Sequence, residues 1–223
     1  RFSEKLDRIA ETASLAAASD AKVLAKALEG GSARPGIAVG SGGSAIAAEY
    51  FARCRETLFS VRTFVETPME FVLGASRITS SDVWLFSAGS DNADVLAAVE
   101  SAIRRRASAI HLVTRNPEGL AAMKVSAAGG NVHAVPVVDV KDGYLATHSL
   151  VGTTTALLAA SDLVSGEPVG ANLTASYLTG VQERLSATAR ERARKQFQSL
   201  KPSDTMLLLT DPQAKPIATL IDT

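Results

Sequence analysis

Two turns rich in glycine and serine constrain this chain more than any other feature, because each joins a short apolar run to a helix-like segment. The first turn, residues 40–44, follows the apolar run 36–39, and the second turn, residues 87–92, follows the run 83–86. Turns after two parallel strands lie at the same edge of a sheet, where backbone N–H groups and hydroxyls can surround one anion. The pattern therefore predicts an α/β fold with a phosphate-binding edge.

The rest of the chain continues this alternation of strand-like and helix-like segments. Strands are predicted at residues 36–40, 60–65, 82–87, 108–114 and 131–138. Helices are predicted at residues 43–57, 67–75, 91–106, 117–128, 147–163 and 173–197. Parallel strands joined in this way need helices on both faces of the sheet. We therefore expect a doubly wound, five-stranded parallel sheet in a three-layer αβα arrangement of the flavodoxin-like kind.

The two ends of the chain predict its domain organisation. Small or apolar residues recur at helical spacing through residues 2–27, interrupted by Asp20, and predict one long amphipathic helix within residues 1–35. Because this helix precedes the sheet, we expect its apolar face to pack on another lobe or on a second copy of the chain. Residues 36–200 form the predicted domain. Residues 201–223 resemble the start of a second one, so we expect the natural protein to continue.

Composition argues against several classes of protein. Twenty-three Lys and Arg residues balance 23 Asp and Glu residues, so no overall field draws the chain to nucleic acid or to an anionic membrane. No apolar stretch of the sequence approaches the ~18 residues that cross a bilayer. The single cysteine, Cys54, excludes an intramolecular disulfide, and no spacing of ligating side chains indicates a metal site. We expect a cytoplasmic protein without a cofactor.

The first turn also satisfies a second pattern, the dinucleotide fingerprint. Gly40, Gly42 and Ala45 have its spacing, and Glu66 stands where a ribose-binding acid would follow the next strand. The serines argue against this interpretation, because nicotinamide pyrophosphate is held chiefly by glycine backbone. A compact phosphate monoester is the favoured ligand, and a nucleotide-dependent oxidoreductase remains a third alternative.

Both turns resemble those of the sugar isomerase (SIS) family of phosphosugar-binding domains. The first loop of that family reads roughly Gly-x-Gly-Thr/Gly-Ser before an alanine-rich helix, and residues 40–45 match it. The second loop reads Ser-x-Ser-Gly-Glu-Thr-x-Asp and is similar to residues 87–94. There the second serine and the glycine have exchanged order as Gly89 and Ser90, and Asn92 replaces the threonine.

A third stretch resembles family members similar to glucosamine-6-phosphate synthase, which read Gly-Val-Ala-Ser-Thr-Lys between the last strand and a helix. Residues 143–148 align with it without gaps, with Ala146 in place of the serine and His148 in place of the lysine. The resemblance implies that Tyr144 and Thr147 line the sugar pocket.

The turns and the resemblance together predict the substrate-binding residues Gly40, Ser41, Gly42, Gly43, Ser44, Ser87, Ala88, Gly89, Ser90, Asn92, Tyr144 and Thr147. The resemblance implies a phosphorylated sugar as ligand, a homodimer, and aldose–ketose isomerisation through an enediol or a related reaction. The general base is unassigned, because in SIS isomerases it is commonly a glutamate from a second domain or a neighbouring subunit. A sugar-phosphate sensor without catalysis is the alternative.

The three histidines differ in their predicted surroundings. His148 begins a helix beside the predicted pocket, so it is the candidate acid–base residue, with solvent exposure or a backbone hydrogen bond as the structural alternative. His111 and His133 alternate with apolar residues in strands and are expected to be structural.

Overall fold

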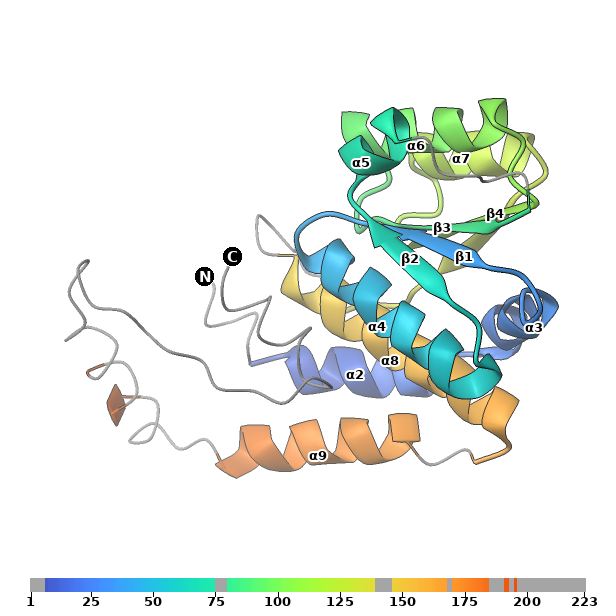
Figure 1. The fold of residues 1–223 in the computed structure, drawn as a ribbon. Helices are drawn as coiled ribbons and strands as arrows, with labels where there is room; N and C mark the ends of the chain where they lie inside the picture. Colours follow the sequence, from blue (N-terminus) through green and yellow to red (C-terminus); the bar gives the residue numbers. More distant parts are fainter. Residues whose placement is uncertain are drawn as a thin grey trace.

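Five parallel strands form one sheet in the order β2-β1-β3-β4-β5 (Figure 1). The strands are β1 (Gly36–Val39), β2 (Thr63–Glu66), β3 (Asp82–Phe86), β4 (Ala109–Thr114) and β5 (Asn131–Ala134). The structure, a computed structural model, describes residues 7–74, 80–138, 146–167, 170–184, 191–192 and 195. The predicted α/β fold is confirmed, whereas the predicted second domain at 201–223 lies outside the described residues.

Helices cover both faces of the sheet (Figure 1). One face carries α5 (Pro68–Leu73), α6 (Ala93–Arg104) and α7 (Leu120–Ala127). The other face carries α3 (Lys22–Gly30), α4 (Gly43–Phe59) and α8 (Thr147–Ser165). Two further helices, α2 (Ile9–Ala17) and α9 (Gly170–Arg184), pack against α8 on its far side from the sheet.

The central strands are apolar on both faces, as strands between two helical layers must be. All residues of β1 and β3 are buried. Trp84 and Phe86 of β3 face α4, where the ring of Phe51 lies 4.5 Å from that of Trp84. Val83 and Leu85 face the opposite core with α5 and α6. The sheet therefore holds the ends of β1 and β3 rigidly.

The N-terminal segment forms two helices, so the expectation of one long helix was wrong. Ser19 Oγ donates to the carbonyl oxygen of Ala16 at 2.6 Å, and the N–H of Lys22 donates to Asp20 Oδ1 at 3.0 Å. Such local side-chain bonds compete with the helical backbone pattern. They end α2 and begin α3, because serine and aspartate favour turns over helix interiors.

The apolar faces of α2 and α3 are covered within the chain, by α8 and, for α2, also by α9. Ala13 and Ala16 of α2 and Leu28 of α3 have no exposed surface. The expected covering by another lobe or by a second copy is therefore corrected for these helices. No helix in the described part of the chain is long and apolar enough to span a membrane.

Two predicted boundaries shift for local reasons. The strand predicted at 131–138 ends at Ala134, before Pro136, which has no N–H to donate to a sheet. The last described helix begins at Gly170 rather than 173, because Asp162 Oδ2 accepts the N–H of Ala171 at 2.8 Å. That carboxylate satisfies one of the donors that a helix start leaves open.

Candidate functional site

The two predicted turns follow β1 and β3, which are neighbours at the centre of the sheet. The order of the strands reverses between them, since β2 lies beyond β1 whereas β4 and β5 lie beyond β3. In open parallel sheets, such a switch point leaves a crevice outside the carboxyl ends of the strands, where ligands bind. The structure thus brings the two turns together at the usual ligand position of this architecture.

A cavity of about 20 Å³ lies at this switch point, between the two turns and the start of α8. We call it the switch-point cavity, and its lining residues are Gly43, Ser44, Ala47, Phe86, Ser87, Ala88, Ala146, Ser149, Leu150 and Thr153. Its volume holds about one water-sized group. A larger ligand would therefore place only its polar tip here, with its body outside.

The first turn brings the start of α4 close to the sheet. A Cβ atom on Gly40 would lie 2.4 Å from the backbone oxygen of Ser44, so only glycine fits there. Gly42 has φ 54°, a left-handed conformation, and no side chain caps the helix that follows. Gly43 and Ser44 line the cavity, whereas Ser41 and Gly42 are exposed and do not.

The second turn separates its two serines. Ser87 lines the cavity, and its Oγ accepts the N–H of Ser90 at 3.1 Å. Ser90 is fully buried, and its hydroxyl donates to Thr114 Oγ1 at 2.7 Å. Its φ of 61° lies in the left-handed region, where the resembling family has glycine. Ser90 therefore shapes the turn, and it does not line the cavity; nor does Asn92, which is exposed.

The second turn is also fixed from the side of β4 and α7. Asp91 Oδ1 accepts the N–H of Leu120, at the start of α7, at 2.8 Å. Asn116 Nδ2 donates to the carbonyl oxygen of Gly89 at 2.9 Å. These bonds hold the backbone beside Ala88, another lining residue, in one conformation. The turn is therefore arranged before any ligand arrives.

The start of α8 supplies two lining hydroxyls that the sequence reasoning missed, Ser149 and Thr153. Both are buried, and they lie four residues apart on one helix face. That spacing of polar residues on an otherwise apolar helix could have identified them. Thr147 is half-buried and does not line the cavity, and Tyr144 lies outside the described residues.

His148 lies in the first turn of α8 but faces away from the switch-point cavity. Its side chain is fully buried, and its Nδ1 lies 2.6 Å from Thr12 Oγ1 on α2. It does not line the cavity, and the solvent exposure offered as one structural alternative is wrong. In this position the imidazole has no direct contact with a ligand of the cavity.

The charge of the switch-point cavity comes from dipoles. Among its described lining residues none carries a charge. The hydroxyls of Ser44, Ser87, Ser149 and Thr153 surround it, and α4 and α8 begin at its wall. A helix N-terminus carries a partial positive charge and free N–H groups, which suit an anion.

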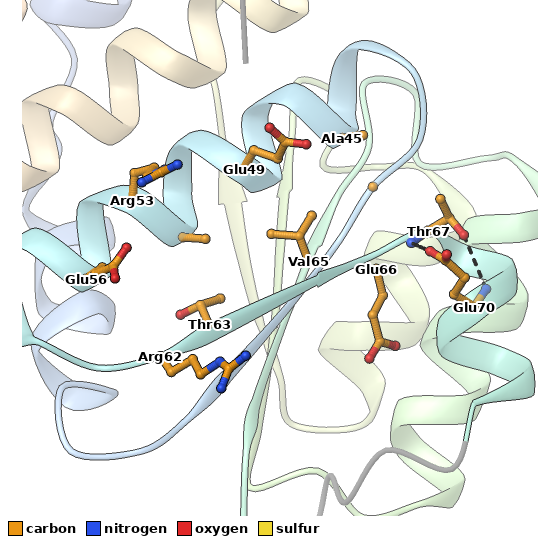
Figure 2. A pocket seen from close by; sticks show the side chains of 12 residues that line it. Ala45, Glu49, Arg53, Glu56, Arg62, Thr63, Val65, Glu66, Thr67 and Glu70 are labelled. Atoms are coloured by element: carbon orange, nitrogen blue, oxygen red, sulfur yellow. Dashed lines mark hydrogen bonds between the residues drawn. The ribbon is translucent and has the colours of Figure 1, made fainter. Parts of the chain in front are cut away.

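A larger cavity of about 490 Å³ lies between α4 and the edge strand β2 (Figure 2). Its charged lining residues are Glu49, Arg53, Glu56, Arg62, Glu66 and Glu70. Its size suits a small molecule. Acids nevertheless outnumber bases four to two, which disfavours a ligand with phosphate groups.

The residues of the dinucleotide fingerprint reach this larger cavity without converging in it. Gly40, Ala45 and Glu66 all line it. In Figure 2, Thr63 and Val65 point from β2 toward α4, whereas Glu66 points to the other side of the strand. Because successive strand residues face opposite sides, this carboxylate lies away from the start of α4. The arrangement weakens the nucleotide interpretation.

His111 and His133 belong to the core, as predicted. The rings of Trp84 and His111 stack with centroids 4.0 Å apart, and His111 Nδ1 lies 3.1 Å from His133 Nε2. Burial lowers the pKa of His111 to about 3 and that of His133 to about 4, so both are neutral at pH 7. In the described part of the chain, no group of three ligating side chains could hold a metal ion.

Comparison with known proteins identifies relatives by structure alone. No protein-family model and no curated protein sequence matches the chain. A tagatose-6-phosphate ketose/aldose isomerase from Escherichia coli matches with a TM-score of 0.63 and 14% identity, over 83% of this chain and 53% of that one. The Vibrio vulnificus NanR protein complexed with ManNAc-6P matches with a TM-score of 0.56 and 16% identity, over 84% and 70%.

A third structure, an Escherichia coli CFT073 protein in complex with a phosphosugar, matches with a TM-score of 0.52 and 18% identity, over 78% of this chain and 96% of that one. The chain thus spans about half the length of the tagatose-6-phosphate isomerase but most of the CFT073 protein. At these identities the likeness shows a shared fold. The chain has the SIS-like fold of phosphosugar isomerases.

Proposed function

We propose that this chain binds a phosphorylated sugar, with the phosphate at the switch-point cavity. The observation that carries the proposal is the convergence of hydroxyls from three separate segments: Ser44, Ser87, and the pair Ser149 and Thr153. The starts of α4 and α8 add backbone N–H groups at the same point. Neutral donors around a helix N-terminus favour an anion without requiring a lysine or arginine.

The size of the cavity favours a phosphate monoester. A space of about 20 Å³ admits a phosphate oxygen but no sugar ring, so the sugar would lie outside it. The same position is the ligand position of other open parallel sheets. The solved structures that share this fold support the assignment, since both the NanR protein and the CFT073 protein are complexed with a phosphosugar.

Isomerisation through an enediol is the first candidate reaction, and it needs a base near the sugar. The described residues that line the cavity include no carboxylate and no imidazole. We therefore propose that the base comes from a second, similar domain beginning near residue 201 or from the partner in a homodimer. We also propose a cytoplasmic location for this chemistry.

Binding without catalysis is the second candidate, and the absence of a base among the described lining residues favours it. The likeness to the NanR protein complexed with ManNAc-6P is compatible with this alternative. Solvent deuterium exchange at C2 of fructose 6-phosphate or glucose 6-phosphate separates the two candidates, because only an enediol mechanism incorporates the label.

Calorimetric titration with glucose 6-phosphate, fructose 6-phosphate, glucose and inorganic phosphate tests the binding itself. We expect the sugar phosphates to bind at least about a hundredfold more tightly than glucose, because several hydrogen bonds to a charged group are lost together. Equal affinity for glucose and glucose 6-phosphate would refute the proposal.

A further inference from the structure

The start of α8 forms one wall of the switch-point cavity through Ala146, Ser149, Leu150 and Thr153. No side chain caps this helix, and its N-cap residue, Ala146, has φ 26°. L residues rarely adopt that region, and strained residues persist where the surrounding structure holds them. A contact from outside α8 is therefore needed to fix this end of the helix.

His148, the second residue of α8, makes such a contact. Its Nδ1 lies 2.6 Å from Thr12 Oγ1, and both side chains are fully buried. Thr12 belongs to α2, whose apolar face packs against α8. Breaking a bond between two groups without access to water leaves both unsatisfied, which makes the contact costly to lose.

Thr12 also contacts the chain that precedes α8. Its Oγ1 accepts the N–H of Val138, four residues after the end of β5, in a longer bond of 3.4 Å. One hydroxyl therefore joins α2, the segment after β5 and the first turn of α8. Thr12 does not line the switch-point cavity, so any effect on a ligand passes through α8.

We propose that Thr12 and His148 are positioning residues, whose hydrogen bond holds the start of α8 so that Ser149 and Thr153 face the phosphate. The binding part of this inference rests on the proposed function. The position of α8 can be measured without a ligand. In this arrangement α2, which lies outside the β/α alternation, takes part in the site.

Thr12→Val tests the proposal, because it removes the hydroxyl at nearly constant shape, whereas Thr12→Ser keeps it. In Thr12→Val we expect faster amide exchange of Leu150, whose N–H donates to Ala146 O at 3.1 Å. We also expect changed ¹⁵N shifts of the His148 ring and about tenfold weaker binding of glucose 6-phosphate. Thr12→Ser should stay within about twofold of the unchanged protein.

Thr155→Val is the matched control, since Thr155 is buried on the same helix but does not line the cavity. We expect it to leave the exchange of Leu150 and the affinity unchanged. Unchanged exchange and affinity in a folded Thr12→Val protein would overturn the inference, as would an equal loss of protection throughout the sheet.

The two proposals fail in different ways. If the unchanged protein binds no sugar phosphate, the proposed function is wrong, and the amide exchange of Leu150 still decides whether Thr12 positions α8. Faster exchange confined to the start of α8 supports the positioning role, and no change in exchange overturns it.

Discussion

The two ends of the sheet hold polar groups of opposite character. At the amino ends of the strands, the fully buried Asp82 receives a two-pronged contact from Arg34, with distances of 2.8 and 3.0 Å. Beside it the fully buried Arg55 donates to the carbonyl oxygens of Gly31 and Arg34 at 2.6 and 2.7 Å. The carboxyl ends carry hydroxyls and helix starts around a cavity, with no charge among the described lining residues.

This difference teaches that charge density does not locate the ligand site in this fold. The charged groups at the amino ends are bonded to one another and to nearby backbone, and they leave no space for a ligand. A Cβ on Gly31 would lie 2.6 Å from Asp82, and one on Gly36 would lie 1.9 Å from Arg55. The neutral hydroxyls, by contrast, face a cavity. Mutations should therefore affect stability at one end and binding at the other.

The largest expected effect is at the amino ends. Asp82→Ala removes the carboxylate that faces Arg34 and attracts the buried Arg55, whose pKa is already lowered by burial. Losing one partner of a buried charge network costs about 3–5 kcal/mol of unfolding free energy. Urea denaturation measures it. The folded fraction should bind glucose 6-phosphate as the unchanged protein does, and a loss below about 1 kcal/mol would show that this network does not hold the sheet.

The next effect separates the core histidines from both ends. Folding lowers the pKa of His111 to about 3 and that of His133 to about 4, from about 6.5 when exposed. Their neutral forms thus favour the folded state above pH 6.5, and this stability is lost as the pH falls toward 4. We expect each to account for roughly 2–3 kcal/mol between pH 6.5 and pH 4.5.

His111→Phe, which keeps a ring against Trp84, should flatten the curve of unfolding free energy against pH by about that amount. Urea denaturation of both proteins at a series of pH values gives the difference directly, and other titrating groups cancel in it. Parallel curves would contradict the assignment of acid sensitivity to His111.

A smaller effect is expected at the carboxyl ends. Ser44→Ala removes a lining hydroxyl and should weaken glucose 6-phosphate binding about tenfold, which corresponds to one lost bond to a charged group. Stability should change by less than about 1 kcal/mol, because Ser44 is half-buried. Ser41→Ala is the matched control in the same turn, since Ser41 is exposed and does not line the cavity. Equal losses in both variants would place the phosphate elsewhere.

The smallest expected effect is a gain. Gly89→Ser restores a hydroxyl where the resembling family has its second serine, and a Cβ there meets nothing within 4 Å. One added hydrogen bond should tighten glucose 6-phosphate binding about three- to fivefold in calorimetry. Gly89→Ala fills the same space without a hydroxyl and should give no gain. A gain in both variants would point to rigidity of the turn rather than to a new contact.

The pattern of strands, helices and turns could be read from the chain because each depends on residues near one another in sequence. The apolar runs of β1 and β3 and the glycines of the first turn predicted the switch point and four of its lining residues, Gly43, Ser44, Ser87 and Ala88. The direction of a side chain within a turn is not local. Ser87 and Ser90 differ because Thr114 accepts the hydroxyl of Ser90 from β4.

The N-terminal segment and α8 mark the boundary between these two kinds of information. Helical periodicity identified an apolar face in residues 2–27, but its partner, α8, lies more than a hundred residues away in the sequence. The same packing buries His148 against Thr12 and leaves Ser149 and Thr153 at the cavity. Periodicity tells which residues share a face, since it reflects the geometry of one helix. Tertiary packing alone chose which face meets which neighbour, because that choice depends on the shapes and hydrogen-bonding groups of segments far apart in the chain.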